Sequence, residues 1–182
     1  MKSTTVARNY AQALLLAAQA HGAAEIEQYG RLMEAVAGAV EGDERIAVAL
    51  ESPRVSKAVK AGLLQRALGD LAPPEFVRFL QAVVRRGRQG LVGEIVQQYH
   101  ALVDVKLNRV HAGVTLLDEP DARLEQAVIE RLSRAIGKEV RAHFRADRGI
   151  LGGVVVRVGD RIYDGSVRRK LATLRRKMLV GE

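Results

Sequence analysis

The residue pattern changes from strand to turn to strand to helix within residues 150–179, and no other stretch limits the fold as much. The valine-rich residues 154–158 favour a strand, because β-branched side chains suit a pleated sheet. Gly152 and Gly153 precede this strand and accept backbone angles that are closed to other residues. The stretch therefore predicts a structural β-hairpin near the C-terminus rather than a catalytic loop.

A tight hairpin turn is predicted at Gly159 and Asp160. The residues after it, 161–163, read as a short return strand, which Asp164 and Gly165 end. Asp160 and Asp164 could be imagined as a carboxylate pair for acid–base chemistry. Both lie beside glycines at turn positions, where aspartate is favoured for its local hydrogen bonds, so we interpret them as turn residues.

A basic, amphipathic helix is predicted to follow, with Ser166 as its N-terminal cap. Its apolar residues recur at spacings of four, three and four, which places them on one stripe: Val167, Leu171, Leu174 and Met178. Arginine and lysine occupy the remainder of the helix surface. The stripe must therefore face either a core or a partner.

The segment GGVVVRVGDRIYDGSVRRKLATL, residues 152–174, closely resembles the C-terminal signature of the delta subunits of F-type ATP synthases. The mitochondrial relative of these subunits is the oligomycin sensitivity-conferring protein. Residues 6–14 resemble the opening helix of that family, and residues 76–91 resemble its fifth helix and the turn that follows. The resemblance spans the chain, closely at the C-terminus and loosely elsewhere.

Six helices joined by short turns are predicted in the first part of the chain, and together they favour a compact helical bundle. Their approximate ranges are residues 6–20, 24–40, 45–50, 56–69, 74–86 and 91–107. Thr4 or Thr5 is the expected cap of the first helix. The expected buried stripe of the fourth helix consists of Val59, Leu63, Leu64 and Leu68.

The second part of the chain mixes strands and helices, so the predicted fold class is α+β. Residues 109–116 alternate as a strand does, a helix is expected from Glu119 and Pro120 to Ile136, and residues 140–144 read as a second strand. We therefore predict two domains, a six-helix bundle over residues 1–108 and a small mixed domain over residues 109–182. No Gly/Ser/Pro-rich linker separates them.

The chain is basic, with a formal net charge of +8, and 16 of its 29 Lys and Arg residues lie in residues 109–182. Clustered cations invite a nucleic-acid interpretation, since phosphate binding releases counterions. However, tryptophan is absent and aromatic residues make up only 4% of the chain, so base-stacking side chains are scarce. A basic nucleic-acid-binding adaptor remains the alternative to an interaction subunit with an acidic protein partner.

Known catalytic patterns are absent from the sequence, so we expect no enzymatic activity, cofactor or metal. It contains no phosphate-binding loop, dinucleotide fingerprint or nucleophile elbow. Gly152 and Gly153 could approach a phosphate, but a strand follows them where a helix N-terminus would be needed. The four histidines are scattered, although a zinc site requires convergent ligands.

The chain has no cysteine, which suits a reducing compartment. No uninterrupted apolar run approaches the roughly 20 residues that cross a bilayer. We expect a peripheral protein on the cytoplasmic face of the bacterial plasma membrane, without direct membrane insertion.

The family resemblance implies a non-catalytic stator subunit, present in one copy, that couples rotation to ATP synthesis. It implies two partners, the N-terminal segments of the alpha subunits and the b subunits of the peripheral stalk. In the family, the alpha segment lies between the first and fifth helices. The corresponding residues here are Tyr10, Ala13, Leu14, Ala17, Phe79, Ala82 and Val83.

The core-like spacing of these seven residues leaves a second interpretation open, in which any one of them only packs inside the bundle. The chain also departs from the family pattern at the end of the fifth helix. An acidic residue and asparagine often precede the Gly-Arg pair there, whereas this sequence reads Arg85-Arg86-Gly87-Arg88. This reversal of charge either changes contacts at the end of the groove or forms a solvated surface.

Overall fold

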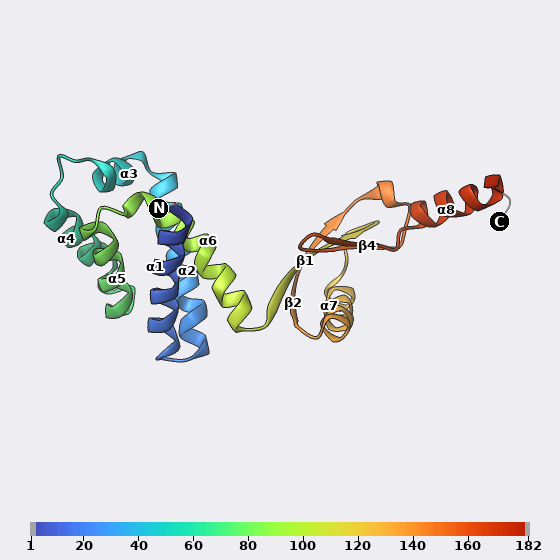
Figure 1. Cartoon of the computed structure of the whole chain (residues 1–182), viewed down its shortest axis with the longest axis horizontal. Coiled ribbons are helices and arrows are strands. Elements are labelled where there is room, and N and C mark those ends of the chain that lie inside the picture. Colours follow the sequence, from blue (N-terminus) through green and yellow to red (C-terminus); the bar gives the residue numbers. More distant parts are fainter. Residues whose placement is uncertain (1–2, 181–182) are drawn as a thin grey trace. The chain divides into compact units, whose positions relative to one another are not determined.

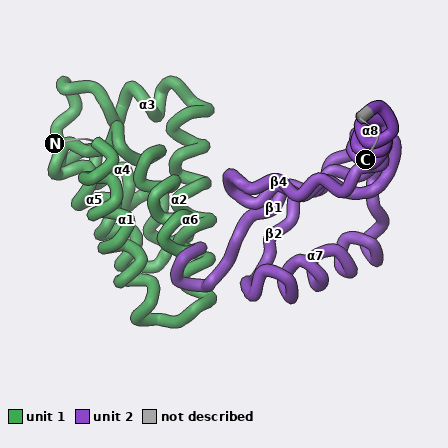
Figure 2. Tube along the Cα trace, turned by 45° about the vertical axis from the view of Figure 1, so that its right-hand side comes forward, with its two compact units in different colours: residues 1–103 green, residues 104–182 purple. Residues whose placement is uncertain are grey.

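The computed structural model describes residues 3–180, and Figure 1 traces the order of its helices and strands. The chain divides into two compact units, residues 1–103 and residues 104–182 (Figure 2). The boundary falls within helix α6 (Val92–Lys106), near its C-terminal end.

The first unit is helical. Before α6 come α1 (Ser3–Gln19), α2 (Ala23–Gly42), α3 (Glu44–Glu51), α4 (Lys57–Leu68), α5 (Pro74–Arg85) and the short 3₁₀ turn η1 (Gln89–Leu91). Thr4 and Thr5 lie inside α1, so the prediction that one of them caps this helix was wrong. The expected cap of α4 is present, because the side chain of Ser56 accepts a hydrogen bond from the Val59 amide at 3.3 Å.

The core of the first unit lies mainly among α1, α2, α5 and α6. Small residues of α1 are fully buried, which allows neighbouring helices to approach closely. The rings of Tyr29 in α2 and Phe76 in α5 meet edge to face, with centroids 5.5 Å apart. Tyr99 in α6 donates a hydrogen bond to the Ile26 carbonyl in α2 at 2.8 Å. Burial raises the pKa of the Tyr99 phenol above its ordinary value.

Helix α4 packs differently from the expected stripe. Val59 is 52% exposed and Leu63 is 38% exposed, whereas Ala61 is buried. The reason lies in the contact with α5, where the side-chain amide of Gln81 donates to the Ala61 carbonyl at 3.4 Å. Since a small residue permits close approach of two helices, Ala61 faces α5, while Leu64 and Leu68 stay half-buried and only Val59 and Leu63 of the expected stripe are exposed.

The second unit is a four-stranded mixed sheet with helices, and the predicted α+β fold class is confirmed. Its elements are β1 (Arg109–Leu116), α7 (Ala122–Ile136), β2 (Glu139–Ala146), the 3₁₀ turn η2 (Arg148–Ile150), β3 (Val154–Val158), β4 (Arg161–Asp164) and α8 (Val167–Val180). The strand order is β2-β1-β3-β4, with β1 parallel to β2 and antiparallel to β3. Strands β3 and β4 form an antiparallel hairpin.

Helix α7 begins at Ala122, after the position expected from Glu119 and Pro120. Asp121 provides the cap, since its carboxylate accepts a hydrogen bond from the Leu124 amide at 2.7 Å. An aspartate in this position satisfies an amide at the start of the helix, which Glu119 does not do.

The core of the second unit lies on one face of its sheet, which α7 covers (Figure 1). The buried residues come from three strands, and α7 contributes half-buried side chains: Ala112, Val114, Val140 and Val156 from the sheet, and Val128, Leu132 and Ile136 from α7. The alternation of buried and exposed positions along β1 and β2 follows from the two-residue period of a strand.

Candidate functional site

The end of α5 is shaped by Gly87, which adopts a left-handed conformation with φ of 68°. The Gly87 amide donates to the Val84 carbonyl at 2.9 Å, and the Arg88 amide donates to the Val83 carbonyl at 3.0 Å. This pair of bonds is the Schellman pattern that ends a helix, and glycine suits its left-handed residue. The turn leaves Arg86 and Arg88 on either side of Gly87.

Helices α1 and α5 meet through one aromatic pair. The rings of Tyr10 and Phe79 lie edge to face, with centroids 6.3 Å apart and an interplanar angle of 73°. Both side chains are half-buried, so each contributes to the packing and also to the surface.

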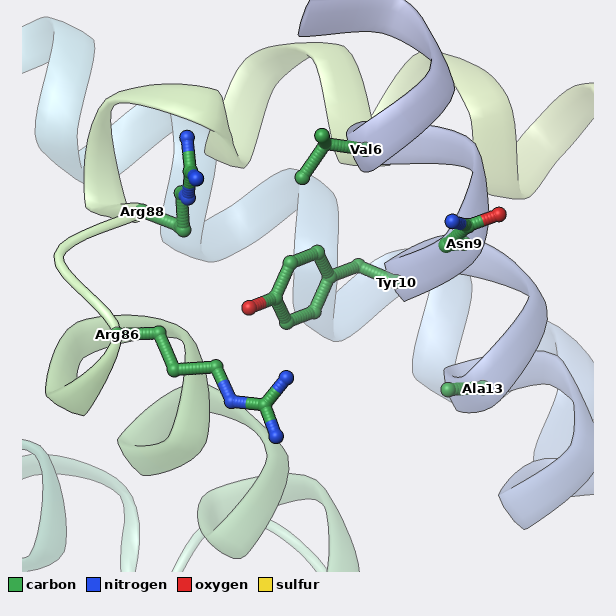
Figure 3. Close-up of a pocket in the computed structure, with 6 residues that line it drawn as sticks. All are labelled: Val6, Asn9, Tyr10, Ala13, Arg86 and Arg88. Atoms are coloured by element: carbon green, nitrogen blue, oxygen red, sulfur yellow. The ribbon is translucent and has the colours of Figure 1, made fainter. Parts of the chain in front are cut away.

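A hollow of about 410 Å³ opens beside this pair, and we call it the α1–α5 groove. Its lining consists of Val6, Asn9, Tyr10 and Ala13 from α1, with Arg86 and Arg88 from the turn after α5. Figure 3 shows the Tyr10 ring projecting between the two arginine side chains. The groove thus offers an apolar and aromatic wall on α1 and two guanidinium groups opposite. Such a surface suits a short apolar anchor with a carboxylate beside it.

The residues carried over from the family resemblance fall into two groups. Tyr10 and Ala13 line the groove, while Leu14 is completely buried and Val83 is 1% exposed. The remaining three lie at the surface to different degrees, with Ala82 exposed and Ala17 and Phe79 half-buried. Leu14 and Val83 are therefore core residues in this structure.

The two groove arginines were missed as site residues, although the reversal of charge around Gly87 was visible in the sequence. Both are exposed. The signal that could have identified them is the glycine that ends α5, because a left-handed cap turns the chain and brings the flanking residues to the end of the helix.

Backbone hydrogen bonds hold the start of β3 against the start of α8, and we call this contact the clasp. It includes the signature residues Gly152, Gly153 and Gly165. A side chain added at Gly153 would lie 2.5 Å from the Gly165 carbonyl oxygen, which no Cβ atom tolerates. The Gly165 amide donates to the Val154 carbonyl at 2.9 Å, and the Val167 amide donates to the Gly152 carbonyl at 3.0 Å. Glycine at position 153 is thus required by the close approach of two backbone segments.

Asp164 and Ser166 complete this clasp at the start of α8. The Ser166 amide donates to the Asp164 carboxylate at 2.9 Å, and the Arg169 amide donates to the Ser166 hydroxyl at 3.2 Å. Hydrogen bonds from Ser166 hold the pKa of the Asp164 carboxyl below its ordinary value. Gly159 and Asp160 form the two-residue turn between the paired residues Val158 and Arg161.

The apolar stripe of α8 is exposed. Val167 is 38% exposed, Leu171 52%, Leu174 56% and Met178 83%. Figure 1 shows α8 extending away from the sheet of its own unit. An amphipathic helix with an uncovered stripe is a surface on which a partner can be bound.

Residues 3–180 contain neither a metal-binding cluster nor a membrane-spanning helix. No three His, Asp or Glu side chains there are grouped as a metal ion requires. Over the same residues, none of the helices combines the length and apolar character that crossing a bilayer demands.

Comparison with known proteins places the chain in a family. The family model described as ATP synthase delta (OSCP) subunit matches residues 6–178. The ATP synthase subunit delta of Gemmatimonas aurantiaca is 46% identical over 178 residues, which is 98% of this chain and 95% of that protein. The ATP synthase subunit delta of Desulforamulus reducens is 34% identical over 174 residues, 96% of this chain and 95% of that protein.

The fold is also similar to that of a chain in the Toxoplasma gondii mitochondrial ATP synthase hexamer. The TM-score is 0.61 at 19% identity, over 95% of this chain and 97% of that one. The close sequence matches along nearly the whole length and the shared fold agree with the signature residues described above. The chain therefore belongs to the ATP synthase delta (OSCP) subunit family, whose members are non-catalytic subunits of the F-type ATP synthase.

Proposed function

We propose that this chain links the N-terminal segments of the alpha subunits in the catalytic head to the b subunits of the peripheral stalk. As a member of the delta family it is a stator-type subunit of the F-type ATP synthase, and its role is mechanical. By holding the head against the torque of the rotor, it allows rotation to drive conformational change at the catalytic sites. The single observation that most supports the head contact is the α1–α5 groove.

The first domain, residues 1–108, is the part that binds the head in this proposal, with its six helices acting as one bundle. An amphipathic helix bound in a groove needs small residues for close approach and a few larger apolar contacts. Ala13 supplies the first requirement, and the half-buried pair Tyr10 and Phe79 supplies the second. Leu14 and Val83 support the groove from within the core.

The arginines of the groove add a chemical preference to this contact. Arg86 and Arg88 lie across from α1 and are exposed. A guanidinium group binds a carboxylate through two parallel hydrogen bonds when the geometry allows. We therefore expect the bound alpha segment to present an acidic side chain next to its apolar residues.

The second domain, residues 109–182, binds the b subunits in this proposal. The exposed stripe of α8 supports it, because an amphipathic helix with no covering element gains stability when a second helix buries its apolar side. The chain then acts in one copy per complex, peripheral to the cytoplasmic face of the bacterial plasma membrane.

The test is the binding of the protein to a purified catalytic head from which this subunit has been removed. Ala13→Asp and Ala82→Asp each place a charge at an exposed alanine of α1 or α5, so the protein should fold normally but lose the head. Gln12→Asp, at an exposed position on another side of α1, is the matched control and should bind as the natural sequence does. Unchanged binding by both alanine variants would contradict the proposed head contact.

A further inference from the structure

We propose that the uncovered face of the sheet in the second unit binds an acidic segment of a partner protein. We call this surface the outer face, and its residues are Arg109, His111, Gly113 and Thr115 of β1, Glu139, Arg141, His143 and Arg145 of β2, Val155 and Arg157 of β3, and Ile162 and Asp164 of β4. The inference extends the proposed stalk role. It rests on one part of that role, namely that the second unit has a protein partner.

The outer face is basic because of the strand period. Side chains alternate between the two faces of a sheet, and the apolar residues of β1, β2 and β3 point toward α7. The alternate positions of β2 are therefore left for Glu139, Arg141, His143 and Arg145, which places two arginines on the outer face of this edge strand. Arg157 extends the charge to β3 on the other side of β1.

The outer face keeps a small net positive charge, because its four arginines outnumber Glu139, Asp164 and the neighbouring Asp104. Glu139 lies at one end, where its carboxylate is 3.0 Å from the Arg109 guanidinium and 3.2 Å from that of Arg141. Asp164 lies in β4, and its carboxylate is held by the Ser166 amide. Other exposed side chains of the outer face are His143, Arg145 and Arg157.

Gly113 leaves one position near the centre of the outer face without a side chain. It pairs with His143 of β2 on one side and with Arg157 of β3 on the other. A Cβ atom added at Gly113 would meet nothing within 4 Å. A partner side chain can therefore approach the backbone there, with His143 on one side of it and Arg157 on the other.

The side chains of His111 and His143 on the outer face contact each other, and His111 also contacts a carboxylate. The rings of His111 and His143 stack with centroids 5.7 Å apart and an interplanar angle of 10°. The Nε2 atom of His111 lies 3.2 Å from the carboxylate of Asp104. These contacts restrict the two imidazole side chains before a partner arrives, which lowers the entropy lost on binding.

No helix of the described second unit covers the outer face. Helix α7 packs against the opposite face of the sheet. The side chains of α8 from Val167 to Leu179 are all exposed, and this helix extends away from the strands (Figure 1). The outer face is thus available to a partner without any rearrangement of this unit.

Charge complementarity indicates what the partner is. Exposed arginines on a sheet attract carboxylates and can bind them through two hydrogen bonds, and a histidine ring N–H can donate to a carboxylate as well. Nucleic acid fits this surface less well, because the described residues of the outer face include no Phe, Tyr or Trp, and their two histidine rings stack on each other. An acidic protein segment, with an apolar side chain near Ile162, matches the surface better.

The experiment measures binding of the whole protein to the soluble part of the b subunit from the same organism, and separately to a glutamate 20-mer peptide. Gly113→Glu places a negative charge at the open position, and Arg157→Glu reverses the charge beside it. Arg131→Glu, at an exposed position of α7, changes net charge equally to Arg157→Glu and is the control. Circular dichroism confirms that each variant is folded.

The proposal expects both outer-face variants to bind the b subunit at least about tenfold more weakly than the natural sequence, with the control unchanged. Equal losses in the control and the variants would overturn it, because net charge alone would then explain binding. Full b binding by both variants would overturn it as well, while leaving the stalk role intact. Tighter binding of a 20-base-pair DNA duplex than of the b subunit at the same salt would also overturn it.

The two proposals can fail separately. If the natural protein does not bind the b subunit, the stalk role fails. Binding of the glutamate peptide that Gly113→Glu abolishes and Arg131→Glu retains would still support an acidic partner. Absence of binding to both probes would overturn the outer face as a docking surface.

Discussion

The rings of Tyr10 and Phe79 meet edge to face across α1 and α5, with their centroids 6.3 Å apart. Each side chain is half-buried, so this contact joins the core of the first unit to the α1–α5 groove. The groove wall therefore depends on the same packing that holds the two helices together.

Replacing Tyr10 with alanine removes this contact and should lower the free energy of unfolding by about 1–2 kcal/mol. Tyr10→Phe keeps an edge-to-face pair and should stay within about 0.5 kcal/mol of the natural protein. Urea unfolding followed by circular dichroism measures both. Equal stability of the two variants would mean that the ring contact does not hold α1 against α5.

Leu14→Ala and Val83→Ala remove fully buried side chains, and each should lower the free energy of unfolding by about 2–4 kcal/mol because a cavity remains in the core. Affinity for the head, measured on the folded fraction, should change little. Ala13→Asp should behave in the opposite way, with nearly normal stability and lost binding. A large loss of affinity in a stable Leu14→Ala protein would return Leu14 to the contact surface.

Tyr99→Phe removes the buried hydrogen bond to the Ile26 carbonyl and should cost about 1 kcal/mol near neutral pH. Because burial raises the folded-state pKa of Tyr99 above the ordinary 10.0, the neutral phenol is favoured in the folded protein. Its contribution is complete below that ordinary value and is lost as the pH rises above it, since the unfolded phenol then ionises first.

The stability advantage of the natural protein over Tyr99→Phe should therefore shrink in urea unfolding above about pH 10. Tyr163→Phe, at a position that is 56% exposed, is the control and should be nearly neutral throughout. An advantage that grows with pH would show that the sign of this linkage is wrong.

Gly153→Ala places a Cβ atom 2.5 Å from the Gly165 carbonyl oxygen at a residue with φ of 82°. It should destabilise the second unit by more than about 2 kcal/mol, since both the contact and the backbone angle are unfavourable. Gly113→Ala, where the space is open, should be neutral or slightly stabilising. Hydrogen exchange in β3 and α8 reports the difference, and similar protection in both variants would contradict the clasp.

Local sequence patterns predicted much of this fold. The valines of β3, the turn at Gly159 and the cap at Ser166 depend on neighbouring residues, so they can be read from the chain. The inward face of α4 could be predicted only in part, since Leu64 and Leu68 are half-buried as expected, whereas Ala61 is buried through its contact with α5, which lies elsewhere in the sequence.

The candidate sites were likewise predictable from the sequence only in part. The helical spacing of Tyr10 and Leu14 predicted that both lie on the same side of α1. It could not show that Tyr10 lines the groove while Leu14 is completely buried. Strand registration brings His143 and Arg157 to the two sides of Gly113. The strand order of the sheet is a property of the whole unit, so this arrangement had no local signal.

The most direct test of the proposed head contact is a calorimetric titration of the whole protein at physiological salt. The titrant is a peptide that covers about the first 20 residues of the alpha subunit from the same organism, a length suited to an amphipathic helix. The account predicts one-to-one binding that Ala13→Asp abolishes and Gln12→Asp retains. Absence of binding to the folded natural protein, or binding that Ala13→Asp leaves unchanged, would contradict it.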